Sequence, residues 1–172
     1  QAATPFCPEG SLSAADDDTT GTLAGDACSI VMKDLWLARL SRPDLSKAIC
    51  SLASNVSKWS TNDDKRLARL MDYMDSSVHY KLVGRVNNPA EKLKLLLFVD
   101  ADFAGEKADV KSTNGGYLVL SGPNTWFPLA WLCKKQTATS RSTTEAGIVA
   151  MAASLFHEAI PIWDLWELLL GR

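Results

Sequence analysis

The sequence predicts a mixed chain of the α+β or α/β class, in which a small helical unit precedes three antiparallel strands and further helices. Three observations predict this class. Apolar residues recur every three or four positions between residues 28 and 75, which is the helical period. Beyond residue 92, short apolar runs alternate with turn residues, as in antiparallel strands. An apolar helical pattern then returns near residue 142.

The first segment, 1–27, is rich in Ala, Thr, Gly, Ser and Asp and lacks periodicity, so we expect a poorly ordered leader. A helix is predicted over 28–40, because its apolar residues form one broad face and the pattern stops before Pro43. A second helix is predicted over 43–57, since proline is accepted in a first helical turn.

A third helix is predicted over 61–75, where Ser60 begins a run of capping residues. After it the period changes to alternation, which predicts a strand over 78–83 that closes the helical unit, 28–86. The run Asn87-Asn88-Pro89 is typical of a linker.

The second unit is expected over 92–172 and opens with a strand at 94–101, apolar enough to be central in a sheet. Two further strands are predicted at 117–120 and 125–133, because the turn residues Ser121-Gly122-Pro123-Asn124 separate two apolar runs.

A helix is predicted to begin at Ser142 or Thr143, and Pro161 is expected to interrupt it after Ile160. A last amphipathic helical segment is predicted over 162–170. No stretch approaches the ~20 apolar residues of a membrane span, and we expect no membrane partner.

Charge is unevenly distributed, although the net charge is only −2. Residues 1–30 carry five acidic and no basic side chains, whereas residues 31–99 carry twelve basic and seven acidic ones. A basic middle suits a polyanionic partner, and a solvated helical surface explains it equally well. The four cysteines are widely spaced, which favours free thiols in a reducing intracellular compartment.

Two acids follow the first predicted strand of the second unit, and a third acid opens the helix after the sheet. Asp100 and Asp102 end the strand, and Glu145 lies at the start of the helix. A strand-end aspartate that faces a helix carboxylate can hold Mg²⁺, because hard cations take oxygen ligands. This arrangement is typical of enzymes that cut phosphodiesters.

Five runs together resemble a known family. They are LWLARLSRPDLSKAI (35–49), KRLARLMDYM (65–74), FVDADFAG (98–105), KSTNGGYLVL (111–120) and KKQ to STTEA (134–146). Their order is that of the Pol polyproteins of copia-type LTR retrotransposons, in which the reverse transcriptase thumb and connection precede the ribonuclease H domain. The resemblance implies a thumb- or connection-like helical unit and an incomplete RNase H-like fold.

The resemblance also assigns roles to the acids. Asp100 matches the first catalytic aspartate, which bridges the metal ions, and Asp102 is expected to point to the other face, where it caps the strand or binds the loop 105–111. The family glutamate that faces Asp100 is replaced here by Gly147. Glu145 is about 200° away round the helix and takes a first-turn role instead. The later catalytic acids of the family have no match before Arg172.

We therefore expect a segment of a Pol polyprotein related to Mg²⁺-dependent hydrolysis of RNA in RNA–DNA hybrids, catalytically inactive as written and with no Mg²⁺ bound. Six basic residues are expected to contact nucleic acid, namely Lys65, Arg66, Arg69, Lys134, Lys135 and Arg141. Two alternatives stay open: a non-catalytic nucleic-acid-binding or interaction module, and a relic without function. Without a parallel neighbour, the strand edge 94–99 is expected to pair with the rest of a polyprotein or with itself.

Overall fold

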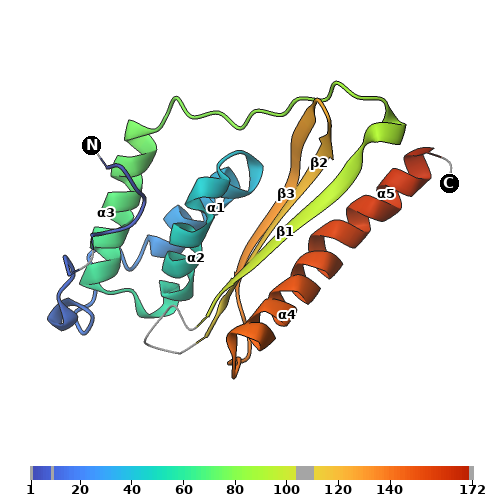
Figure 1. Cartoon of the computed structure of the whole chain (residues 1–172). Helices are drawn as coiled ribbons and strands as arrows, with labels where there is room; N and C mark the ends of the chain where they lie inside the picture. The colour runs from blue at the N-terminus through green and yellow to red at the C-terminus, as the bar shows by residue number, and fades with distance from the viewer. Residues whose placement is uncertain (1, 9, 104–110, 171–172) are drawn as a thin grey trace. The chain divides into compact units, whose positions relative to one another are not determined.

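The chain forms a mixed α+β structure, as the sequence predicts, in a computed structural model that describes residues 2–8, 10–103 and 111–170 (Figure 1). It divides into a helical unit, residues 1–82, and a sheet unit, residues 83–172. The two units are described separately below.

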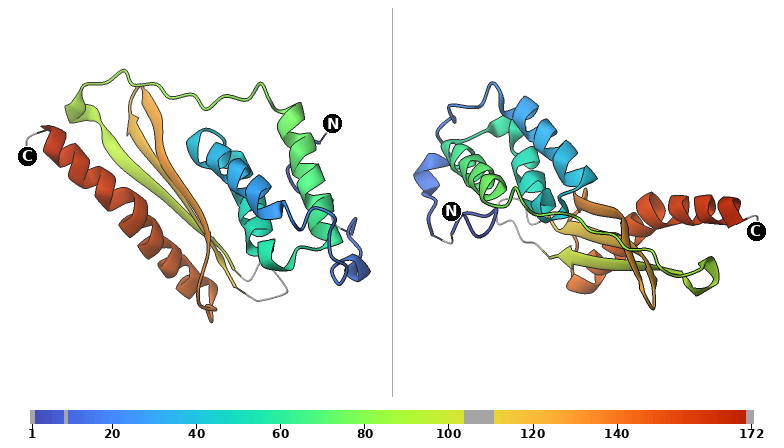
Figure 2. Two further views of the ribbon diagram at one scale, coloured as in Figure 1. Left: turned by 180° about the vertical axis from the view of Figure 1, so that it is seen from behind. Right: turned by 90° about the horizontal axis from the view of Figure 1, so that it is seen from above.

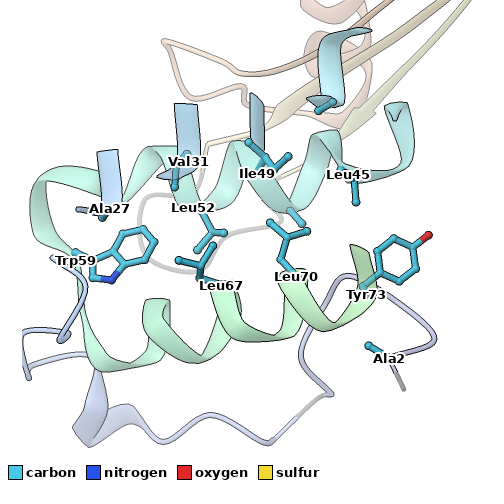
Figure 3. Packing of buried hydrophobic residues seen from close by; sticks show 12 residues of the cluster. Ala2, Ala27, Val31, Leu45, Ile49, Leu52, Trp59, Leu67, Leu70 and Tyr73 are labelled. Atoms are coloured by element: carbon cyan, nitrogen blue, oxygen red, sulfur yellow. The ribbon is translucent and has the colours of Figure 1, made fainter. Parts of the chain in front are cut away.

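Three helices make the helical unit: α1 (Ala27–Leu40), α2 (Ser46–Ser54) and α3 (Thr61–Ser76). Short 3₁₀ turns flank α2, and the first of these starts at Pro43, as expected for a proline at a helix start. Figure 3 shows the core, in which apolar side chains from the three helices interlock. Its largest fully buried members are Val31, Leu45, Ile49, Leu52 and Leu70.

The start of α3 is fixed by a capping box. The Ser60 hydroxyl accepts a hydrogen bond from the backbone N–H of Asp63, and the Asp63 carboxylate accepts one from the N–H of Ser60 at 3.0 Å. The carboxylate also accepts bonds from Asn55 (3.0 Å) and Arg66 (2.7 Å), although Asp63 is 1% exposed. A fully partnered acid therefore holds the first turn of α3 to the end of α2.

The leader is ordered by contacts with α3 where the structure describes it, although its composition predicts a poorly ordered segment. Arg69 Nε donates to the carbonyl oxygens of Thr4 (3.0 Å) and Phe6 (3.1 Å), and Asn62 donates to the carbonyl of Ser13 (2.7 Å). Asp64 accepts hydrogen bonds from the N–H and hydroxyl of Thr22. Composition did not predict these contacts because their donors and acceptors lie some forty to sixty residues apart.

The strand predicted over 78–83 is wrong. Those residues form a turn and an irregular segment, in which Val78 is 80% and Val83 72% exposed. Alternation alone cannot hold a strand, because its backbone groups need a neighbouring strand with which to pair. Pairing in this segment is confined to an isolated bridge further on, between Arg85 and Trp126.

The sheet unit holds three antiparallel strands in the order β1-β2-β3: β1 (Lys94–Asp102), β2 (Thr113–Gly122) and β3 (Thr125–Lys135). These three strands and their antiparallel order confirm the prediction. Leu97 pairs with Leu118, and Tyr117 pairs with Trp131. A bulge between Leu118 and Val119 shifts the β2–β3 register by one residue.

A long helix follows the sheet and lies along one of its faces (Figures 1 and 2). It comprises α4 (Thr143–Ser154), a π-helical turn (Leu155–Ala159) and α5 (Ile160–Leu170). The interruption predicted at Pro161 is wrong. Proline lacks an N–H and its ring crowds the preceding turn, and the wider π turn just before it relieves that crowding.

Because the helix continues through the proline, the residues 143–168 are long and apolar enough, by length and composition, to cross a membrane. The sequence analysis expected no stretch of this kind, so this finding differs from it. A core helix of a protein outside membranes meets the same criteria of length and composition. Many of its large apolar side chains are exposed, including Ile148, Met151, Phe156, Trp163, Leu165 and Leu168.

Candidate functional site

The candidate site lies at the end of β1, where both aspartates have exposed side chains. Asp100 pairs with Gly115 of β2, and Asp102 pairs with Thr113. The expectation that Asp102 points to the other face is wrong, because residues two apart on a strand share a face. Within the loop expected to bind Asp102, residues 105–110 lie outside the described part of the chain.

The register shows which face of the sheet α4 covers. A Cβ atom built on Gly116 would lie 2.4 Å from the hydroxyl of Ser154, so the Gly116 position faces α4. Gly116 pairs with Val99, and directly paired residues share a face. The face covered by α4 is therefore that of Leu95, Leu97 and Val99.

Asp100 comes one residue after Val99 and belongs to the opposite face. A Cβ atom built on Gly115, the residue paired with Asp100, would meet no atom of α4 within 4 Å. Its nearest neighbour would be the Asp100 carbonyl oxygen, at 3.6 Å. Helix α4 packs against β1, as expected. The side chain of Asp100, however, belongs to the face of the sheet that α4 does not cover.

Position 147, where the family glutamate is expected, is open. A Cβ atom on Gly147 would meet nothing within 4 Å outside its own helix. The structure therefore has room for a side chain there. Gly147 is two residues beyond Glu145, which lies in the first turn of α4, as predicted.

Glu145 is engaged in holding the start of α4. Its carboxylate accepts a hydrogen bond from the backbone N–H of Arg141 at 2.6 Å, and its own N–H donates to the Ser142 hydroxyl at 3.1 Å. A carboxylate in the first turn is also favoured by the helix dipole. These contacts indicate a capping role.

Sequence reasoning missed the buried amide that joins the sheet to α4. Gln136 Nε2 donates to Asn114 Oδ1 (2.6 Å) and to the carbonyl of Ala146 (3.0 Å), and Gln136 Oε1 accepts from Ser140 (2.8 Å). Gln136 is 4% exposed, so these bonds are made away from water. The signal available in the sequence was the position of Gln136 within the run 134–146, which resembles the family.

The six basic residues divide between the two units. In the helical unit, Lys65 forms an ion pair with Asp16 at 2.6 Å and Arg66 one with Asp63, while Arg69 donates to backbone carbonyls of the leader. Each of these three therefore has a partner within the chain. Their contact with nucleic acid stays a prediction.

In the sheet unit, Lys134 and Lys135 end β3, and Arg141 is exposed before α4. The carboxyl ends of β1 and β3 lie at the same end of the sheet, because both strands run antiparallel to β2. Two lysines and two aspartates therefore flank one sheet end. Among the described residues, no group of three or more His, Cys, Asp or Glu side chains could hold a metal ion. The described residues thus do not fit a two-metal site.

Comparison with known proteins gives several relatives. The chain is 31% identical over 145 residues to the retrovirus-related Pol polyprotein from transposon RE1 of Arabidopsis thaliana, covering 83% of this chain and 9% of that protein. It is 32% identical over 116 residues to the corresponding polyprotein from transposon RE2 of the same plant, covering 67% of this chain and 8% of that protein. The chain thus spans less than a tenth of either polyprotein.

A shorter relative is the secreted RxLR effector protein 161 of Plasmopara viticola. It is 30% identical over 118 residues, which cover 69% of this chain and 78% of that protein. No family model matches the chain, and no solved structure matches it.

Proposed function

The chain belongs to the retrovirus-related Pol polyproteins of copia-type transposons, and from this premise we propose that residues 83–172 are an RNase H-like region that does not cleave nucleic acid. The related chemistry is Mg²⁺-dependent hydrolysis of RNA in an RNA–DNA hybrid. The helical unit predicted over residues 28–86 corresponds in this proposal to the thumb and connection of a reverse transcriptase.

Two observations together carry the proposal of inactivity. Glycine stands at position 147, and the strand register turns the Asp100 carboxylate to the sheet face opposite α4. A two-metal mechanism needs carboxylates that converge on both ions. Here one carboxylate is replaced by Gly147, and the carboxylate of Asp100 belongs to the other face of the sheet. The two positions therefore do not supply ligands to the same pair of metal ions.

We expect no cleavage of an RNA–DNA hybrid by the wild-type chain with either Mg²⁺ or Mn²⁺. The measurement is a gel assay of a labelled hybrid over hours, with an active ribonuclease H as positive control. Asp100→Asn is the matched negative control. Turnover by the wild type that Asp100→Asn abolishes would contradict the proposal.

Gly147→Glu is expected to fold and still not cleave. The open space at position 147 accommodates the side chain, and replacing a helical glycine raises stability by up to about 1 kcal/mol. Thermal unfolding followed by circular dichroism tests the first part, and the hybrid assay tests the second. Cleavage restored by this single change would show that Asp100 reaches the helix after all.

A second candidate function is a non-catalytic nucleic-acid-binding or interaction module. The specific observation is the Plasmopara viticola relative, of which this chain covers 78% and which is named as an effector. If Lys134, Lys135 and Arg141 hold a polyanion, hybrid binding falls steeply with salt. Absence of binding in 20 mM salt, measured by fluorescence anisotropy, would remove this candidate. A chain without helical circular dichroism would instead favour a relic.

A further inference from the structure

The leader runs along one face of α3, in the direction opposite to the helix. Four side chains of α3 donate to it, namely Asn62, Lys65, Arg69 and Ser76. Their spacing places them on one stripe of a helix. At the far end of this stripe, the Ser76 hydroxyl donates to the carbonyl oxygen of Ala2 (3.0 Å), which lies near Tyr73 in Figure 3. Two of the four side chains under the leader are therefore basic.

The leader offers these two basic side chains the kind of acceptor that a phosphate backbone offers. Asp16 pairs with Lys65 at 2.6 Å, and Arg69 Nε donates to the carbonyl oxygens of Thr4 and Phe6. Residues 1–30 also carry five acidic and no basic side chains. By its charge and its oxygen acceptors, the leader occupies a surface that suits a polyanion.

The middle of the leader is held weakly, whereas both of its ends are packed. We name the described residues 3–8 and 10–18 the strap, and none of them is buried. Before the strap, Ala2 is only 5% exposed. After it, Gly21 packs so closely that an added Cβ atom would lie 2.5 Å from the Ser60 carbonyl oxygen. A segment held by surface hydrogen bonds opens at a lower free energy than the whole unit unfolds.

We infer that the stripe of α3 under the strap is a binding site for the phosphate backbone of nucleic acid, and that the strap closes it. This inference rests on the nucleic-acid-binding module given above as the second candidate function. In the closed state, oxygens of the chain itself engage Lys65 and Arg69. When the middle of the strap lifts from α3, both side chains are free to bind phosphates. The observed affinity is then the affinity of the open form multiplied by the open fraction.

Asn62→Ala opens the strap without changing any charge. The Asn62 amide donates to the carbonyl oxygen of Ser13 (2.7 Å) and to the Asp17 carboxylate (2.8 Å), and both acceptors belong to the strap. Alanine is also the better helix former, so α3 is retained. Loss of the two hydrogen bonds is expected to raise the open fraction about fivefold. Equal circular dichroism of the wild type and the variant checks that the helices are intact.

The first measurement needs no nucleic acid. Cys7 lies in the strap, where its half-buried thiol donates to the Lys65 carbonyl oxygen at 3.8 Å. Its alkylation by a maleimide, followed by mass spectrometry of peptides from the full 172-residue chain, reports how often the strap lifts. We expect Cys7 to react about fivefold faster in Asn62→Ala than in the wild type. Cys28, an exposed thiol of α1, is the internal control and reacts at the same rate in both.

The second measurement is binding of a labelled RNA–DNA hybrid in 20 mM salt, followed by fluorescence anisotropy. Asn62→Ala is expected to bind about fivefold more tightly than the wild type. Lys65→Ala leaves the wild-type affinity almost unchanged, because the lost phosphate contact is offset by the lost pairing with Asp16. In the Asn62→Ala background it weakens binding about fivefold. Lys33→Ala changes an exposed lysine of α1 and has the same effect in both backgrounds.

Two results overturn the inference and leave the binding module standing. One is hybrid binding by a chain whose Cys7 reacts equally fast with and without Asn62→Ala, since the strap then does not open. The other is faster Cys7 labelling with unchanged hybrid affinity, since the strap then covers no binding site. Absence of hybrid binding by every variant overturns the binding module, and the site under the strap falls with it.

Discussion

Replacing Gly116 by alanine is expected to lower the free energy of unfolding of the sheet unit by about 2–3 kcal/mol. The added Cβ atom would lie 2.4 Å from the Ser154 hydroxyl and 3.0 Å from its Cβ atom, both in the buried contact between β2 and α4. Ser154 is fully buried, and its Cβ atom is held in place by the backbone of the helix. Urea unfolding followed by circular dichroism gives the measurement.

The adjacent glycine provides the control. A Cβ on Gly115 points to the opposite face and meets its nearest neighbour, the Asp100 carbonyl oxygen, at 3.6 Å, which is ordinary contact. Gly115→Ala is therefore expected to change stability by less than about 1 kcal/mol. Equal losses for the two glycines would contradict the packing of α4 on the Gly116 face.

Ser154→Ala adds a rescue to this pair of variants. The Ser154 hydroxyl is buried without a hydrogen-bond partner, so its removal alone is expected to be neutral or stabilising. In the Gly116→Ala background the same change removes the closest clash and recovers part of the lost stability. A rescue in the Gly115→Ala background as well would show that the effect is not specific to the contact.

Elements with an unbroken local pattern were predictable from the sequence. The periods of α1 and α3, the cap at Ser60 and the turn before β3 are all set by neighbouring residues. The strand expected at 78–83 had the local pattern but no partner, and pairing is decided by distant parts of the chain. The continuous helix through Pro161 required a π turn that no local rule places there.

The candidate site was predictable in composition and less so in geometry. Asp100 does end a strand, and Glu145 does open a helix that packs on that strand. The face to which Asp100 belongs depends on which residues α4 covers, and the close approach of Gly116 and Ser154 reveals this. The order of the motifs along the chain identifies which residues match the family. Which face of the strand meets the helix is set by tertiary packing and cannot be found from that order.

Asp63→Ala is expected to lower the stability of the helical unit by about 3 kcal/mol, because it leaves buried donors without their acceptor. Asp63 is 1% exposed and accepts hydrogen bonds from Asn55, Ser60 and Arg66. Asp72→Ala changes an exposed residue of the same helix, and we expect it to cost at most about 0.5 kcal/mol. Chemical unfolding of both variants at pH 7 measures the difference.

The pH dependence of this loss tests its electrostatic cause. Burial alone raises the pKa of Asp63, but hydrogen bonds from Asn55, Ser60 and Arg66 outweigh it and hold the pKa below the ordinary value of 3.8. Because its pKa is lower in the folded chain, Asp63 takes up a proton more readily in the unfolded chain as pH falls below 3.8. The ionised carboxylate therefore stabilises the fold above pH 3.8, and this stabilisation is lost in acid. The advantage of the wild type over Asp63→Ala is therefore full at neutral pH and shrinks as pH falls through the lowered pKa. A difference that stays constant down to pH 2 would mean that lost packing, and not the charged acceptor, explains the destabilisation.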